Sequence, residues 1–166
     1  AFWGIYKFRT EEQGYTWLKM DVSIAKLRGI PDTIVNSKFW ESQDKGLQQF
    51  GDQQNYMSYS NTLHPFTQIQ ITDKGLEILQ SLVENVRSMV GYEIPISTDH
   101  YGHFDFNNGI RLGRALEKYR LAWLEDIVSW EYTEQWKKLT DALETPTTTG
   151  EDIYLLKSFK PLIEGR

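Results

Sequence analysis

The sequence predicts an α/β fold in which βα units build a parallel sheet, and three observations lead to this prediction. First, 166 residues with 40% hydrophobic content and six tryptophans are enough for one globular domain with a packed core. Second, short apolar runs alternate with segments of helical periodicity in the second half of the chain, which is the pattern of βα units. Third, three of these runs end near an acidic residue, at a constant interval of 26 residues.

The first half of the chain combines one strand and one long helix with an irregular segment. We expect a strand over Gly14–Asp21, which ends in polar residues, and a helix over Asp73–Val90, where apolar residues recur at helical spacing. The segment 22–72 between them breaks the rhythm, although Pro65–Thr72 alternates like a short strand. A long insertion at the C-terminal end of a strand is usually functional, so we expect segment 22–72 to be a lid or specificity loop.

The second half of the chain follows a regular strand–helix order. The predicted elements are a strand at Tyr92–Asp99, a helix at Asn107–Tyr119, a strand at Leu121–Asp126, a helix at Trp130–Leu143, a short strand at Thr145–Asp152 and a helix at Asp152–Arg166. Parallel strands that are joined by crossover helices end at the same edge of the sheet. That edge is where α/β folds build their sites, so residues at the strand ends are the candidates for function.

Three acidic residues occupy these strand ends. Asp99, Glu125 and Glu151 are separated by 26 residues each, about the length of one βα unit, so we expect equivalent positions on three adjacent strands. Three converging carboxylates repel one another, so either their pKa values rise or a cation lies between them. Oxygen ligands without any cysteine favour Mg²⁺. The alternative is a rim of ordinary solvated acids, which is the commoner situation for any single one of them.

Lys19 and Asp21 form a second group of candidates at the end of the first strand. They are two residues apart and therefore share one face of the strand. A lysine that is partly desolvated beside a metal has a lowered pKa and can act as a base, or its charge can neutralise a substrate carboxylate. The alternative is a lysine that only extends its ammonium group into solvent. We therefore include both residues as candidate catalytic residues.

Two histidines follow the first of the three acids. His100 is adjacent to Asp99, and His103 lies three residues further along. A histidine beside a metal-bound substrate is suited to act as a general acid that protonates a leaving hydroxyl. The alternative is a loop histidine that caps a helix or faces solvent. The sequence leaves open which of the two enters the site.

Composition excludes several classes of function. A net charge of −5 argues against general nucleic-acid binding, which needs clustered basic residues. The absence of cysteine removes disulfides, thiolate metal sites and a cysteine nucleophile. No apolar run approaches the roughly 20 residues of a membrane span, and the first residues do not resemble a signal peptide. We expect a cytoplasmic protein with no membrane partner, whose start at Ala1 indicates processing or a piece of a longer chain.

Several motifs together resemble the enolase superfamily. The resemblance is greatest to the mandelate racemase / muconate lactonizing enzyme group and, within it, to the sugar-acid dehydratases. It covers Gly14–Asp21 and nearly all of Asp73–Arg166. The motifs, in chain order, are WLKMD at Trp17–Asp21, STDHYGHF at Ser97–Phe104, LAWLEDI at Leu121–Ile127 and PTTTGED at Pro146–Asp152.

This resemblance implies a fold, a metal and a reaction. The fold is a TIM-barrel-type (β/α) fold, here about half of a (β/α)8 barrel, with Asp99, Glu125 and Glu151 as the Mg²⁺ ligands. The reaction is the dehydration of a sugar acid, a lyase activity. A base removes the proton α to the carboxylate, the metal stabilises the enediolate, and an acid expels the β-hydroxyl. Lys19 takes the position of the family's strand-two lysine, and we expect the full-length protein to be a homo-oligomer.

The chain departs from the family pattern at several positions. Asp21 stands where many relatives have a second lysine, which favours a dehydratase over the alternative of a racemase or cycloisomerase. Tyr101 stands where such dehydratases often have a histidine, with His100 and His103 on either side. The strand-four motif ends in Glu125-Asp126-Ile127 instead of the usual Glu-Asp-Pro or Glu-Glu-Pro.

The family also contains an N-terminal capping domain and later barrel strands that this sequence lacks. We therefore expect residues 1–166 to be a partial barrel domain that can hold the metal ligands and be inactive by itself, because about four strands cannot close a barrel. Two further alternatives come from other classes. One is a non-catalytic relative that only binds metal, and the other is an unrelated βα domain whose acidic strand ends hold Mg²⁺ without chemistry.

Overall fold

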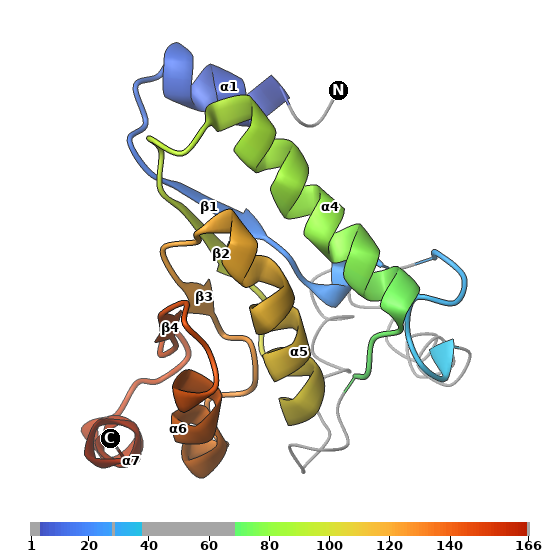
Figure 1. Ribbon diagram of the computed structural model, residues 1–166. Helices are drawn as coiled ribbons and strands as arrows, with labels where there is room; N and C mark the ends of the chain where they lie inside the picture. Colours follow the sequence, from blue (N-terminus) through green and yellow to red (C-terminus); the bar gives the residue numbers. More distant parts are fainter. Residues whose placement is uncertain (1–3, 28, 38–68, 166) are drawn as a thin grey trace, which may run out of the picture.

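The sheet has four parallel strands in the order of the sequence. A computed structural model describes residues 4–27, 29–37 and 69–165 of the chain. The strands are β1 (Leu18–Asp21), β2 (Ile96–Asp99), β3 (Leu124–Glu125) and β4 (Thr147–Thr148), with the order β1-β2-β3-β4 and parallel pairing throughout. Figure 1 shows the strands side by side in this order. The predicted parallel α/β sheet is therefore confirmed.

The helices follow one another along the sheet. Each packs on the next one described in the chain, α1 on α4, α4 on α5, α5 on α6 and α6 on α7, and Figure 1 shows α4, α5 and α6 in succession. This arrangement is that of crossover helices on parallel strands. The bounds are α1 (Gly4–Glu11), α4 (Asp73–Val90), α5 (Phe106–Leu116), α6 (Thr133–Asp141) and α7 (Leu156–Glu164), with single 3-10 turns η1 (Ile24–Lys26) and η3 (Glu117–Tyr119).

Side-chain caps fix where the two best-packed helices begin. The hydroxyl of Thr72 accepts a hydrogen bond from the backbone N–H of Gly75 and starts α4, while the carboxylate of Asp105 accepts from Asn108 and starts α5. Both contacts satisfy a helix-terminal N–H that has no partner inside the helix. Helix α4 ends at Gly91, whose φ of 70° lies in the left-handed region that glycine adopts without strain.

The core lies between one face of the sheet and the helices. In β1, Leu18 and Met20 are buried whereas Lys19 and Asp21 are exposed, as strand alternation requires. The buried side chains of β1–β3 therefore pack against the apolar faces of α4, α5 and α6. Lys19 and Asp21 lie on the opposite face of the sheet. Within the described residues, none of the helices is long and apolar enough to cross a membrane.

The strands are shorter than predicted, and part of the insertion cannot be compared. The predicted third and fourth strands each keep only two residues in strand conformation, because regular backbone pairing stops at Glu125 and Thr148. In segment 22–72, Ile69 and Ile71 form isolated bridges to Phe104 and Ile34 instead of a continuous strand. Residues 38–68 lie outside the described residues, so the predicted lid stays a prediction.

Candidate metal centre

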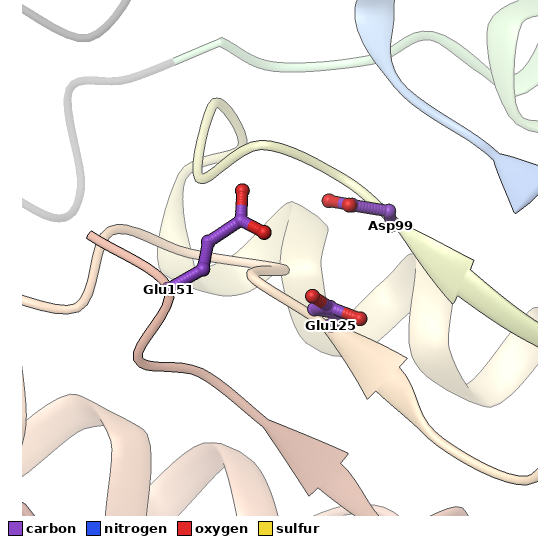
Figure 2. A group of neighbouring side chains, drawn as sticks. All are labelled: Asp99, Glu125 and Glu151. Atoms are coloured by element: carbon purple, nitrogen blue, oxygen red, sulfur yellow. The ribbon is translucent and has the colours of Figure 1, made fainter. Parts of the chain in front are cut away.

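Three carboxylates meet at the C-terminal edge of the sheet. Asp99 and Glu125 are the last residues of β2 and β3 and are paired directly in register, and Glu151 comes from the loop after β4. One oxygen of each carboxylate lies within 4.8 Å of the others. Figure 2 shows the three groups turned toward a common space. The side chains of Asp99 and Glu125 are only 3% and 14% exposed, so their charges are poorly hydrated.

Glu151 reaches this space by a different route from the one predicted. The partner of Glu125 in β4 is Thr148, and Glu151 lies three residues beyond it in a turn. Gly150, with a φ of 134°, provides a backbone conformation that L side chains rarely adopt and turns the chain after the strand. The prediction that Glu151 ends a strand in register with the other two acids was therefore wrong, although its carboxylate does join theirs.

Among the described residues, Lys19 brings a positive charge to the three-acid group, by which we mean Asp99, Glu125 and Glu151. Its Nζ donates hydrogen bonds to Asp99 Oδ2 at 2.9 Å and to Glu125 Oε1 at 3.0 Å. Partial burial lowers the pKa of Lys19, but the hydrogen bonds and charges of Asp99 and Glu125 outweigh this and raise it above its ordinary value. The lowered pKa was expected for a lysine beside a bound metal, so for the metal-loaded site it stays a prediction. The ammonium group keeps its proton and hydrogen-bonds to two of the three carboxylates, but its single positive charge offsets only one negative charge.

Burial and, to a smaller extent, mutual repulsion raise the pKa of several carboxyl groups at this edge. Burial, with the charge of Glu125 added, raises the pKa of Asp99, although Lys19 opposes the shift. Burial together with the charge of Asp99 raises the pKa of Glu151. Burial and the charges of all three acids raise the pKa of Asp126 to about 6, against a hydrogen bond from Thr149. Each shift records the cost of holding negative charge here, which a divalent cation relieves.

Asp21 forms a pair with Tyr101, which was not among the candidate site residues of the sequence analysis. It is paired in register with Asp99, and its Oδ1 accepts a hydrogen bond from the hydroxyl of Tyr101 at 2.9 Å. The backbone N–H of Tyr101 also points to Asp99 Oδ1, at 3.3 Å. Burial raises the pKa of Tyr101, and the hydrogen bond and charge of Asp21 raise it further. Tyr101 therefore stays a hydrogen-bond donor beside the three-acid group.

His100 lies on the opposite face from its neighbour Asp99. It is completely buried, with Nδ1 at 2.7 Å from the carbonyl of Val22 and Nε2 at 3.0 Å from the hydroxyl of Thr98. Burial lowers the pKa of His100 to about 4, so the ring is neutral near pH 7. Its single N–H is then on Nδ1, because the Val22 carbonyl can only accept. These contacts argue against His100 as the general acid.

His103 is buried as well, but it lies on the loop beside Tyr101. The two rings have centroids 6.3 Å apart, and the backbone of His103 pairs with Val128 and Ile69. Its side chain is 3% exposed. The structure thus separates the two histidines, and the acid role predicted for His103 stays a prediction.

Sequence reasoning missed two contacts that hold the acids in place. The indole N–H of Trp123 donates to Glu125 Oε2 at 3.1 Å, and the hydroxyl of Thr149 donates to Asp126 Oδ1 at 2.6 Å. In each case the donor lies two residues before an acid of the three-acid group, Trp123 before Glu125 and Thr149 before Glu151. For Trp123 this spacing was a usable signal, because residues two apart in a strand face the same side.

The donor set fits a hard divalent cation. All three candidate ligands offer carboxylate oxygens, which Mg²⁺ prefers, and their oxygens are close enough together to share one ion. Lys19 already brings a positive charge to two of them. Clusters of acidic residues also occur without an ion. The argument for a metal site here is therefore the low exposure of Asp99 and Glu125 and the raised pKa values of Asp99 and Glu151.

Comparison with known proteins gives this geometry a family context. The model of the family described as "Enolase C-terminal domain-like" matches residues 7–166. A D-mannonate dehydratase from Caulobacter vibrioides is 32% identical over 151 residues, which are 91% of this chain and 33% of that protein. The chain thus spans about a third of the length of this relative.

Two solved structures extend the comparison. A mandelate racemase/muconate lactonizing enzyme-like protein from Rubrobacter xylanophilus superposes with a TM-score of 0.69 at 23% identity, over 98% of this chain and 33% of that one. An L-talarate/galactarate dehydratase from Salmonella typhimurium, liganded with Mg and L-lyxarohydroxamate, gives 0.52 at 31% identity, over 57% of this chain and 24% of that one. The first likeness concerns the fold alone.

Proposed function

Because the chain belongs to the enolase C-terminal domain-like family, we propose that it forms the metal-binding part of a Mg²⁺-dependent sugar-acid dehydratase. The observation on which the proposal depends is the convergence of Asp99, Glu125 and Glu151, whose oxygens lie within 4.8 Å of one another. The dehydratase names of relatives at 32% and 31% identity, and the Mg in one of their structures, support the choice of reaction and metal.

The proposed roles follow from where the side chains lie. Asp99, Glu125 and Glu151 hold Mg²⁺, which when bound supplies the positive charge that makes a proton α to a carboxylate removable. Lys19 keeps its proton and extends its ammonium group over the three-acid group, so it is suited to bind the negative charge of the substrate. Asp21 and Tyr101 offer an acceptor and a donor that match the hydroxyl groups of a sugar acid.

Proton transfer to the leaving hydroxyl needs a group that can release a proton. His100 does not fit this role, because its one N–H is bound to the carbonyl of Val22 in a dry environment. We keep His103 as the candidate acid, since its ring lies near that of Tyr101. Replacing His103 with asparagine would then abolish the loss of water while leaving the affinity for Mg²⁺ unchanged, and an unaffected rate would remove it from the mechanism.

The first test of the proposal is Mg²⁺ binding and dehydration by the complete polypeptide in which these residues occur. Calorimetric titration should show Mg²⁺ binding that Glu125→Gln weakens strongly, because an amide is a much poorer ligand than a carboxylate. The same protein, screened with hexonic and hexaric acids, should release a 2-keto-3-deoxy acid. Mg²⁺ binding with racemisation and no loss of water would replace the dehydratase with a racemase. No Mg²⁺ binding in a folded protein would reject the metal centre.

A further inference from the structure

Glu125 has both of its carboxylate oxygens occupied by different donors. Oε1 accepts the ammonium group of Lys19 at 3.0 Å, and Oε2 accepts the indole N–H of Trp123 at 3.1 Å. The two contacts differ in kind. Lys19 is a flexible cation on another strand, with a side chain that is 42% exposed, whereas Trp123 is a rigid neutral donor two residues earlier in the chain, directly before β3. Only the tryptophan bond can survive when another cation takes the place of the ammonium group.

Two contacts hold Trp123 in place, one through its backbone and one through its ring. Its backbone carbonyl accepts the N–H of Thr98, which fixes the residue to β2. Its ring packs on that of Trp17, with centroids 4.9 Å apart and an angle of 30° between the planes. The indole N–H of Trp17 in turn points to the hydroxyl of Ser97, at 3.4 Å. We call Trp17 and Trp123 together the aromatic layer; it contacts the three-acid group through the hydrogen bond from Trp123 to Glu125.

We propose that Trp123 is a positioning residue for the metal centre, which orients Glu125 so that Oε1 faces the ion and Oε2 is withheld from it. The inference rests on the proposed metal centre and adds to it a donor outside the ligand set. A carboxylate with one oxygen bound to a rigid donor presents the other as a single ligand of defined direction, as the near-octahedral geometry of Mg²⁺ demands. Without the indole N–H, the carboxylate can rotate and offer both oxygens.

The energetic reason is the low exposure of Glu125. Its side chain is 14% exposed, so water replaces a lost donor poorly, and a hydrogen bond to a charged group in such surroundings is stronger than one in water. Substitutions of residues that orient a metal ligand typically lower metal affinity by about 10–100-fold. We expect a change of this size when only the N–H of Trp123 is removed.

The test compares two tryptophans that share one aromatic layer. Trp123→Phe removes the N–H on Glu125, while Trp17→Phe removes an equivalent N–H that points to Ser97 and touches no ligand. Mg²⁺ affinity is measured by calorimetry on the complete polypeptide, and the thermal unfolding midpoint is measured without Mg²⁺. If Trp123→Phe does not fold, β-(3-benzothienyl)-alanine at position 123 keeps the bicyclic ring shape and lacks only the N–H.

Each outcome has a definite meaning. A dissociation constant that rises about tenfold or more in Trp123→Phe, but stays near wild type in Trp17→Phe with similar unfolding midpoints, supports the positioning role. Equal weakening by both variants would mean that packing of the aromatic layer is responsible, and would overturn the inference. Unchanged affinity in Trp123→Phe would overturn it while leaving the metal centre intact. If the wild-type protein binds no Mg²⁺, both the centre and the inference fail.

Discussion

Replacing Lys19 with methionine tests the electrostatic account of the site most directly. Lys19 is the cation that hydrogen-bonds to Asp99 and Glu125, and methionine keeps most of its length without the charge. In buffer without divalent ions, the variant lacks the positive charge that offsets part of the repulsion among the three carboxylates. We therefore expect its free energy of unfolding to be lower than that of the wild-type protein. With Mg²⁺ present, the same variant should bind the ion more tightly, because the ammonium group no longer competes for the same oxygens.

The size of both effects follows from exposure. Breaking a buried ion pair costs about 3–5 kcal/mol and breaking an exposed one about 0–1 kcal/mol. Lys19 is 42% exposed whereas Asp99 is 3% exposed, so we expect an intermediate loss of about 2 kcal/mol. Removing a positive charge beside a divalent ion is worth on the order of 1.4 kcal/mol even with strong solvent screening, which is a tenfold gain in affinity.

The assay combines urea unfolding with and without Mg²⁺ and calorimetric titration of Mg²⁺. Because a ligand that binds only the folded state stabilises it, the stability gap between wild type and Lys19→Met should close as Mg²⁺ is added. The control is Lys137→Met. Lys137 pairs with Asp141 at the same distance of 2.9 Å, but both side chains are exposed and lie outside the site.

Two results would refute this reasoning. If Lys19→Met is as stable as wild type without Mg²⁺, the ammonium group does not offset the repulsion among the acids. If Mg²⁺ affinity falls in Lys19→Met, the lysine supports the ion instead of competing with it. Loss of stability in Lys137→Met to the same extent would show that any lysine on this acidic protein has the same effect.

Four further substitutions probe the residues around the site. Arg87→Met should lower the free energy of unfolding by about 3 kcal/mol in urea, because its buried guanidinium group donates to four backbone carbonyls. Gly75→Ala should cost about 1–3 kcal/mol, measured likewise, because its Cβ would lie 2.2 Å from the carbonyl oxygen of Thr33. Asp126→Ala should weaken Mg²⁺ binding in calorimetry more than Thr149→Val does, because both remove one hydrogen bond but only Asp126→Ala also removes a carboxyl group near the three acids; full affinity in both variants would contradict this.

Helix positions were more predictable than strand ends, for a physical reason. The predicted helix Asp73–Val90 is confirmed at both ends, because apolar spacing, the cap at Thr72 and the glycine at position 91 agree. The strand predicted over Thr145–Asp152 is confirmed only at Thr147–Thr148. A run of β-branched residues indicates extended backbone, but pairing ends where the neighbouring strand ends, and the sequence of one strand does not contain that information.

The candidate site was predictable in its residue types and only partly in its geometry. The 26-residue spacing was enough to predict that Asp99 and Glu125 lie together, because each ends its strand and the two are paired in register. The same spacing gave the wrong local structure for Glu151, since an interval of 26 residues does not distinguish a strand end from a turn. The side to which His100 points could not be derived either, because it depends on whether the chain continues straight or turns after Asp99.

The turns explain why acidic side chains collect at this edge. After each of the strands β2, β3 and β4 the chain soon reaches a left-handed residue, Tyr101 with a φ of 60°, Asp126 with 46° and Gly150 with 134°. For tyrosine and aspartate this conformation is strained, and such strain persists only where surrounding contacts hold it. Tyr101 is held through Asp21 and Asp126 through Thr149. The strand ends therefore stop abruptly and leave the carboxylates facing one another, a repulsive arrangement that a divalent cation would relieve.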